Sequence, residues 1–107
     1  MVYRSVDLGF STADAEDVAM VFERAELRLT FRDWREETVK HTFNDVLAFK
    51  WDRELSIDTI RDDTCYEVID SAWLEEQAHL QGDNQTRFTH YKLCFNACGV
   101  LDVLCAR

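Results

Sequence analysis

The sequence has no proline and only three glycines among its 107 residues. A chain so poor in these two residues has no flexible or polyproline linker and no low-complexity stretch. Hydrophobic residues make up 47% of the chain, which is too large a share for a disordered acidic protein. The lack of linkers and the short length predict one folded domain over residues 1–107.

Basic residues are also scarce, since 12 lysines and arginines stand against 21 aspartates and glutamates, for a net charge of −9. Nucleic acids and anionic membranes are bound mainly through basic side chains that neutralise phosphates, so we expect binding to neither. The excess charge is uneven: residues 1–51 carry net −3, residues 52–83 net −8 and residues 84–107 net +2. The acidity therefore belongs mainly to one segment, residues 52–83.

Long apolar runs are missing as well. Arg4 and Asp7 interrupt the N-terminal run, and no later segment approaches the roughly 18 residues that span a bilayer. We therefore expect a cytoplasmic protein with reduced cysteines. Most of the cysteines are expected to be buried small hydrophobes, and Cys98 an exposed thiol in a turn.

Alternation of apolar and polar residues indicates strands over most of the chain. The expected strands are residues 2–10, 25–32, 38–43, 46–51, 65–69, 88–96 and 100–106. Residues 11–24 fit a helix or a strand equally well. In the first hairpin we expect Phe31 to pair with Val39, because this register keeps Arg28 away from Lys40.

The last hairpin is expected to turn at Gly99, which can supply a left-handed residue. Pairing Asn96 with Val100 would place Leu93 opposite Val103 and gather six apolar side chains on one face. A shift of one residue would break that arrangement.

One helix is predicted over about residues 71–81. Asp70 or Ser71 can cap it, Glu75 and Glu76 lie in or just after its first turn, and Gly82 can end it. The predicted fold class is α+β and β-rich: a mostly antiparallel sheet of about six or seven strands, with one short helix before a C-terminal hairpin.

Motifs for catalysis or metal binding are not found in the sequence. His90 and Cys94 are separated by roughly 13 Å along one predicted strand, so they cannot share a zinc ion. Ser71 and His79 would lie about 12 Å apart on the helix, so we interpret Ser71 as a cap and not as a nucleophile. There is no Gly-x-Ser-x-Gly, phosphate loop or His-Glu-x-x-His pattern. We predict no catalytic residue, no metal and no cofactor.

Trp34 lies in the predicted turn between the strands of the first hairpin. We expect it to pack back over the hairpin, with a role in a contact surface as the alternative.

Three C-terminal segments resemble a known group of proteins. They are Ile-Asp-Ser-Ala-Trp-Leu at residues 69–74, His-Tyr-Lys-Leu-Cys-Phe at residues 90–95 and Gly-Val-Leu-Asp-Val at residues 99–103. This pattern resembles small uncharacterised bacterial single-domain proteins, some of which are grouped with immunity proteins of contact-dependent or polymorphic toxin systems. The first half of the chain is similar only in its strand pattern. The resemblance implies an inhibitory role and carries over no catalytic residue.

The main hypothesis is a small acidic, non-enzymatic binding protein in the cytoplasm, an immunity-type inhibitor that uses the acidic segment against a basic protein partner. The residues expected to contact the partner are Asp58, Asp62, Asp63, Glu75 and Glu76.

Two alternatives remain open. The first is a small enzyme or ligand-binding domain with a pocket between the sheet and the helix. The residues expected to line that pocket are Tyr66, Trp73, His90 and Tyr91. The second is a homodimeric structural or interaction protein that pairs through an exposed strand edge or an apolar sheet face.

Overall fold

The computed structural model describes residues 2–53, 63–95 and 98–107. The elements within them, in chain order, are β1 (Val2–Ser5), β2 (Glu16–Glu23), β3 (Glu26–Arg32), β4 (Thr38–Phe43), β5 (Ala48–Asp52), β6 (Cys65–Ile69), α1 (Ala72–Leu80), the 3-10 turn η1 (Gln85–Arg87), β7 (Phe88–Phe95) and β8 (Gly99–Ala106). The β-rich α+β class, with one short helix before a C-terminal hairpin, is confirmed. No helix in these described ranges is both long and apolar enough to cross a bilayer.

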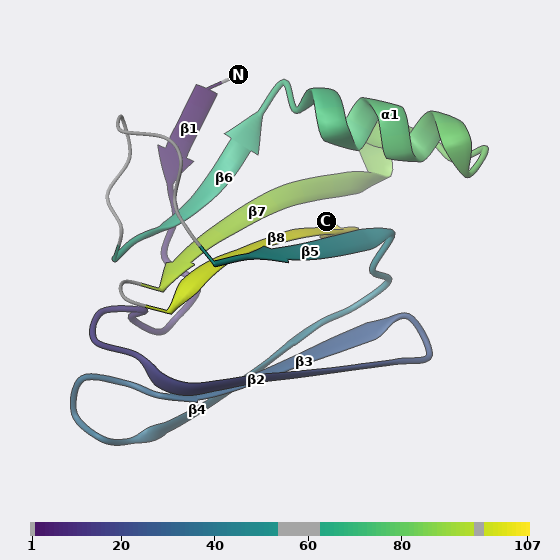
Figure 1. Ribbon diagram of the computed structural model, residues 1–107. Coiled ribbons are helices and arrows are strands. Elements are labelled where there is room, and N and C mark those ends of the chain that lie inside the picture. Colours follow the sequence, from purple (N-terminus) through teal and green to yellow (C-terminus); the bar gives the residue numbers. More distant parts are fainter. Residues whose placement is uncertain (1, 54–62, 96–97) are drawn as a thin grey trace.

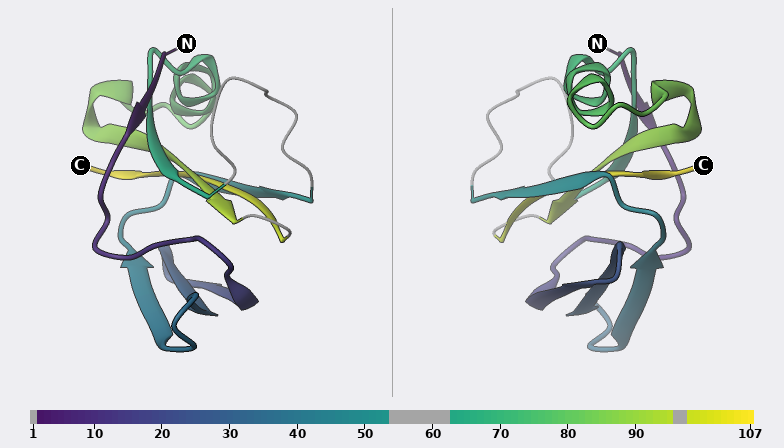
Figure 2. Two further views of the ribbon diagram at one scale, coloured as in Figure 1. Left: turned by 90° about the vertical axis from the view of Figure 1, so that its left-hand side faces the viewer. Right: turned by 90° about the vertical axis from the view of Figure 1, so that its right-hand side faces the viewer.

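The strands form two antiparallel sheets, and α1 lies on the outer side of the larger one (Figure 1). The larger sheet has the order β1-β6-β7-β8-β5 and the smaller one the order β2-β3-β4. Side views show three layers: α1, the five-stranded sheet and the three-stranded sheet (Figure 2). The two central strands of the larger sheet, β7 and β8, are therefore covered on both faces.

The main core lies between the two sheets. Leu27, Leu29 and Phe31 of β3 are almost completely buried there, against Leu93 and Phe95 of β7. Strand β8 adds further buried apolar residues to the same cluster, Leu101, Val103 and Cys105. Since successive strand residues point to opposite faces, the residues between them face α1.

The first hairpin has the predicted register, with Phe31 opposite Val39 and Leu27 opposite Phe43. Arg28 faces Thr42 and not Lys40. The ambiguous segment 11–24 contains strand β2, which pairs with β3.

The predicted register of the last hairpin is wrong by two residues. Leu93 faces Leu101 and not Val103, and Phe95 faces Gly99. A shift of two residues leaves every side chain on its own face, so the apolar pattern does not distinguish the two registers. Gly99 also lies against β5, where a Cβ atom on it would lie 2.5 Å from Trp51 Cζ2 and 2.6 Å from the Asp52 carbonyl oxygen.

The strand predicted over residues 2–10 is shorter in the structure and ends at Ser5. The chain then turns, and the Gly9 amide donates to Asp7 Oδ1 at 2.8 Å. Gly9 has a φ of +90°, which interrupts the extended backbone.

Trp34 does not pack back over the hairpin. Its side chain is 59% exposed, and the Arg35 guanidinium lies 5.6 Å from the ring centre. The turn between β3 and β4 is held instead by Asp33, whose Oδ1 accepts the amides of Arg35 and Glu37.

We predict that Gly99→Ala lowers the free energy of unfolding by about 2–3 kcal/mol, because the new methyl group overlaps Trp51 and the backbone of Asp52. The control is Gly82→Ala, where φ is +67° and no atom lies within 4 Å of the new Cβ. In this control the free energy of unfolding should fall by only about 1 kcal/mol, from the backbone strain of a positive φ. Urea denaturation of both variants measures the difference, and equal losses would contradict the predicted overlap.

Candidate functional site

Asp102 is a carboxylate with no exposed surface in the middle of strand β8. Its neighbours Leu101 and Val103 face the core between the sheets, so Asp102 faces the α1 side. Two lysines stand opposite it on the adjacent strands, Lys92 on β7 and Lys50 on β5. Lys92 Nζ donates to Asp102 Oδ2 at 3.0 Å, which compensates the buried negative charge.

His90 of β7 links this carboxylate to the start of the helix. Its Nε2 lies 2.6 Å from Asp102 Oδ1, and its Nδ1 lies 2.7 Å from Ser71 Oγ. A carboxylate only accepts hydrogen bonds, so the proton of the neutral ring is assigned to Nε2. Nδ1 then accepts from the Ser71 hydroxyl.

Ser71, one of the two residues expected to cap the helix, is the N-cap of α1. Its Oγ accepts the Leu74 amide at 3.1 Å, and its carbonyl oxygen accepts the Glu75 amide. Asp70 precedes it with a φ of +56° and turns the chain sharply from β6 into α1. This turn and the pairing of β6 with β7 bring Ser71 to His90.

The pKa of Asp102 is set by opposing effects. Burial raises it, but the hydrogen bonds from His90 and Lys92 and the positive charge of Lys92 lower it more. The pKa therefore lies below the ordinary value of 3.8, and Asp102 is ionised at neutral pH.

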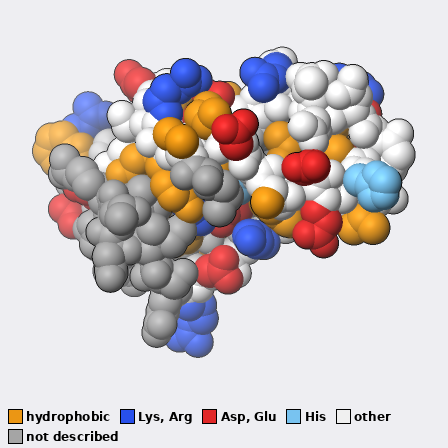
Figure 3. Space-filling model, turned by 90° about the horizontal axis from the view of Figure 1, so that it is seen from above, with side chains coloured by type: hydrophobic (Ala, Val, Ile, Leu, Met, Phe, Trp, Pro, Cys, Tyr) orange, Lys and Arg blue, Asp and Glu red, His pale blue; other side chains and the backbone are white. Residues whose placement is uncertain are grey.

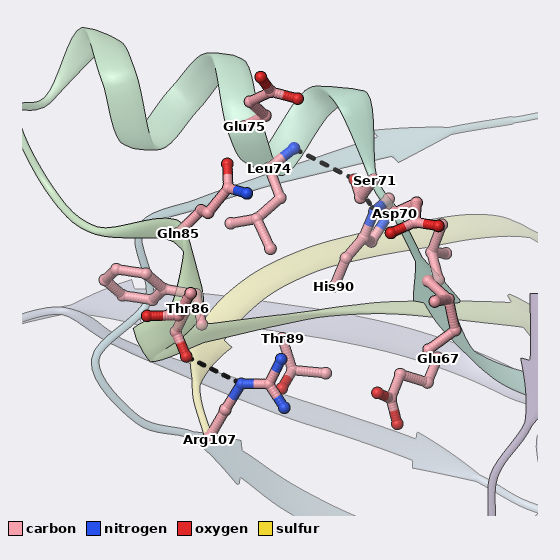
Figure 4. Close-up of a pocket in the computed structure, with 13 residues that line it drawn as sticks. Glu67, Asp70, Ser71, Leu74, Glu75, Gln85, Thr86, Thr89, His90 and Arg107 are labelled. Carbon is pink, nitrogen blue, oxygen red and sulfur yellow. Dashed lines mark hydrogen bonds between the residues drawn. The ribbon is translucent and has the colours of Figure 1, made fainter. Parts of the chain in front are cut away.

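A pocket of about 270 Å³ opens beside this network, between the start of α1, β6, η1 and β7. Ser71 and His90 form part of its wall (Figure 4). The other polar side chains around it include three carboxylates and one guanidinium, from Glu67, Asp70, Glu75 and Arg107. Two of these are engaged elsewhere: Glu67 accepts from Arg4 at 2.7 Å, and Arg107 donates to the Thr86 carbonyl oxygen at 3.0 Å.

One of the four residues expected to line a sheet–helix pocket, His90, lines this one. Tyr91 follows it in β7 and so faces the opposite side, toward Phe43 in the core. Tyr66 is buried with Cys94 and Val100. Trp73 packs its ring edge-on to His90, at 5.3 Å between ring centres.

The five acidic residues expected to contact a partner do not form one described group. Asp58 and Asp62 lie outside the described residues. Asp63 precedes β6, whereas Glu75 and Glu76 are on α1, beyond the other end of that strand. The length of β6 by itself places Asp63 roughly 13 Å or more from the two glutamates of α1.

The four cysteines are free thiols. Cys98 is not the exposed thiol that was expected, since it is half-buried and its Sγ contacts the Ala15 carbonyl oxygen at 3.1 Å. In the described ranges no three His, Cys, Asp or Glu side chains are arranged to hold a metal ion.

The sequence reasoning missed the Ser71–His90–Asp102 contact, although two signals for it exist. Asp102 is a charge within an apolar strand, and His90 lies on the same face of the hairpin as Asp102. In the register that forms, Asp102 stands directly opposite Lys92 and diagonally from His90. A buried charge predicts a partner, but the sequence alone does not say that Ser71 completes the chain of contacts.

A scan against protein-family models finds no matching family, and comparisons with curated proteins and with solved structures find no match either. The resemblance to immunity-type proteins therefore stays a prediction. The fold and the polar network define the chain as a small two-sheet α+β protein with a pocket at its helix–sheet boundary.

We predict that Asp102→Asn lowers the free energy of unfolding at pH 7 by about 3 kcal/mol, because Lys92 and His90 lose a buried charged partner. A carboxylate whose pKa is lower in the folded state stabilises the fold above its unfolded value of 3.8, and this contribution is lost as the pH falls through the lower folded pKa. Urea denaturation between pH 3 and 7 should therefore show a flatter acid limb for the variant. The control is the exposed Asp70→Asn, and a limb as steep in Asp102→Asn as in the wild type would refute the assignment.

We predict that the native protein reacts with a thiol reagent first at Cys98. Burial raises the pKa of Cys65 to about 12 and that of Cys105 to about 11, so neither forms the reactive thiolate near pH 8. Time-resolved labelling with an aromatic disulfide should show one faster site in buffer and four in urea. The faster phase should disappear in Cys98→Ser, and its persistence would contradict the prediction.

Proposed function

We propose that this chain is a binding protein for a basic protein partner, of the kind represented by immunity-type inhibitors, and that it acts in the cytoplasm. One observation carries the proposal: residues 63–83 include six carboxylates and no lysine or arginine. These residues form the strand β6 of the larger sheet, the helix α1 on its outer side and the segments beside them.

In the smaller sheet, by contrast, acidic residues form ion pairs with arginines. Arg32 pairs with Glu16 at 2.6 Å and with Asp17 at 3.1 Å, and Arg28 pairs with Glu23. These exposed pairs add little stability, but they cancel charge locally. The three-stranded sheet therefore presents a mixed surface.

Around α1 such compensation is incomplete. Arg4 neutralises Glu67, and Arg87 neutralises Asp83. The exposed Asp70, Glu75 and Glu76 have no ion pair with any described residue. Seen from the helix side, acidic side chains lie among hydrophobic and uncharged ones, with basic side chains also on this face (Figure 3).

An uncompensated acidic surface steers basic partners and raises their association rate. The pocket lies beside this surface, with Asp70 and Glu75 at its wall. A lysine or arginine side chain of the partner would find carboxylate acceptors there. The cytoplasmic location is supported by the four free thiols, which are typical of a reducing compartment.

The test is capture from lysate of the native cell by the immobilised full chain, at low salt with elution at high salt. We expect a basic protein to bind the wild type and to be lost with Glu75→Lys/Glu76→Lys. The purified partner should then associate at least about tenfold more slowly with this variant, with a weaker dependence on salt.

The matched control is Glu26→Lys/Glu36→Lys, which changes the net charge equally at exposed positions of the smaller sheet. This control should capture the same protein as the wild type. Equal loss in both variants, or no salt-sensitive protein at all, would overturn the proposal. A second copy of this chain as the bound protein would support the homodimer alternative instead.

A second candidate function is a small enzyme or ligand-binding domain. It is favoured by the pocket, because Ser71 and His90 converge there.

A further inference from the structure

We propose that Ser71 is a nucleophile activated by His90, and that the chain hydrolyses small carboxylic esters in the pocket between α1 and β7. This activity goes beyond the proposed binding function and does not rest on it. It would make the chain an enzyme, contrary to the main expectation from its sequence.

The distances are those of a nucleophile, a base and an orienting carboxylate. Ser71 Oγ lies 2.7 Å from His90 Nδ1, and His90 Nε2 lies 2.6 Å from Asp102 Oδ1. The first distance allows proton transfer from the serine to the histidine, and the second allows the carboxylate to orient the imidazole ring. Compared with the usual serine hydrolase arrangement, the two ring nitrogens have exchanged places. The chemistry tolerates this exchange, because either imidazole nitrogen can accept a proton.

The position of Ser71 at the start of α1 adds electrostatic support. The first amides of a helix have no acceptor within the helix and form its positive end. The amides of Ala72 and Trp73 belong to this first turn of a nine-residue helix. Donors of this kind stabilise the oxyanion that forms when a serine attacks an ester carbonyl.

The hydroxyl of Ser71 is also oriented before any substrate binds. Because its oxygen accepts the Leu74 amide, its own hydrogen is free to point to His90 Nδ1. Ser71 and His90 are less than one-tenth exposed, yet both line the pocket of about 270 Å³. The carboxylates at the pocket wall disfavour anionic substrates, so neutral or cationic esters with short acyl groups are the expected class.

The reaction balances with water as the only co-reactant. Ser71 Oγ attacks the carbonyl carbon while its proton moves to His90 Nδ1. The tetrahedral intermediate collapses, the ester C–O bond breaks, and His90 returns the proton to the leaving alcohol. Water then attacks the acyl-serine with His90 again as base, which releases the carboxylic acid and regenerates the hydroxyl.

Asp102 is a positioning residue in this scheme. Its Oδ1 accepts a hydrogen bond from Nε2–H of His90 and so keeps Nδ1 free to act as base, and Lys92 donates to its second oxygen. An asparagine in its place can donate to Nε2 through its amide, which would move the ring proton to Nδ1 and block proton transfer from Ser71.

The experiment uses the purified full chain, a fluorophosphonate probe and p-nitrophenyl acetate. We expect one probe molecule per chain, located at Ser71 by peptide mass spectrometry, and ester turnover that falls at least about 100-fold in Ser71→Ala. The control is Ser11→Ala, because Ser11 Oγ also accepts a backbone amide, from Ala13 at 3.2 Å. This control should keep both the labelling and the turnover.

Probe labelling and ester turnover of the wild-type protein test the proposal even if a variant fails to fold. No probe adduct and no turnover in the wild type, labelling at another residue, or full turnover in folded Ser71→Ala would each overturn it. For Asp102→Asn that circular dichroism shows to be folded, we expect kcat to fall by about 10⁴-fold with KM little changed. An unchanged kcat would show that Asp102 is only structural and would overturn its positioning role. The capture experiment above can fail without affecting these readouts.

Discussion

The buried charge of Asp102 is the constraint that organises the outer face of the larger sheet. Removing a carboxylate from water lowers the stability of the fold by several kcal/mol unless opposite charge and hydrogen bonds compensate the loss of solvent. Lys92 and His90, both on β7, provide that compensation at 3.0 and 2.6 Å. The second nitrogen of His90 is satisfied by Ser71, which also caps α1. One chain of polar contacts therefore joins β8, β7 and the start of the helix.

The central strands serve two purposes because their faces alternate. One face, with residues such as Leu93 and Leu101, packs against the three-stranded sheet and stabilises the fold by burying apolar area. The other face holds the polar network and stands under α1. A buried polar network is rigid only if each of its members has a hydrogen-bond partner. Ser71, His90, Lys92 and Asp102 each have one. The hydrogen bonds that stabilise the network also orient Ser71 and His90 at the pocket wall.

The two sheets also differ in how they present charge. Arginines of β3 neutralise the acidic residues of β2, whereas Glu75 and Glu76 on α1 have no ion pair among the described residues. The uncompensated charge and the pocket thus lie on the same side of the molecule. The proposed binding of a basic partner and the proposed turnover of a neutral or cationic ester both use this uneven distribution of charge, although each depends on different residues.

The sequence alone determined the fold class, the register of the first hairpin and the start of α1 beside Asp70 and Ser71, because period-two alternation and capping are local properties. It left the last hairpin two residues out of register, since such a shift keeps each side chain on its face and the apolar pattern fits both registers. It named His90 as one of four residues of an expected pocket, but it considered only His79 as a partner for Ser71. Ser71 and His90 are 19 residues apart, and only the turn at Asp70 with the pairing of β6 and β7 brings them together. Local patterns therefore determined the elements, whereas tertiary packing decided the contacts between them.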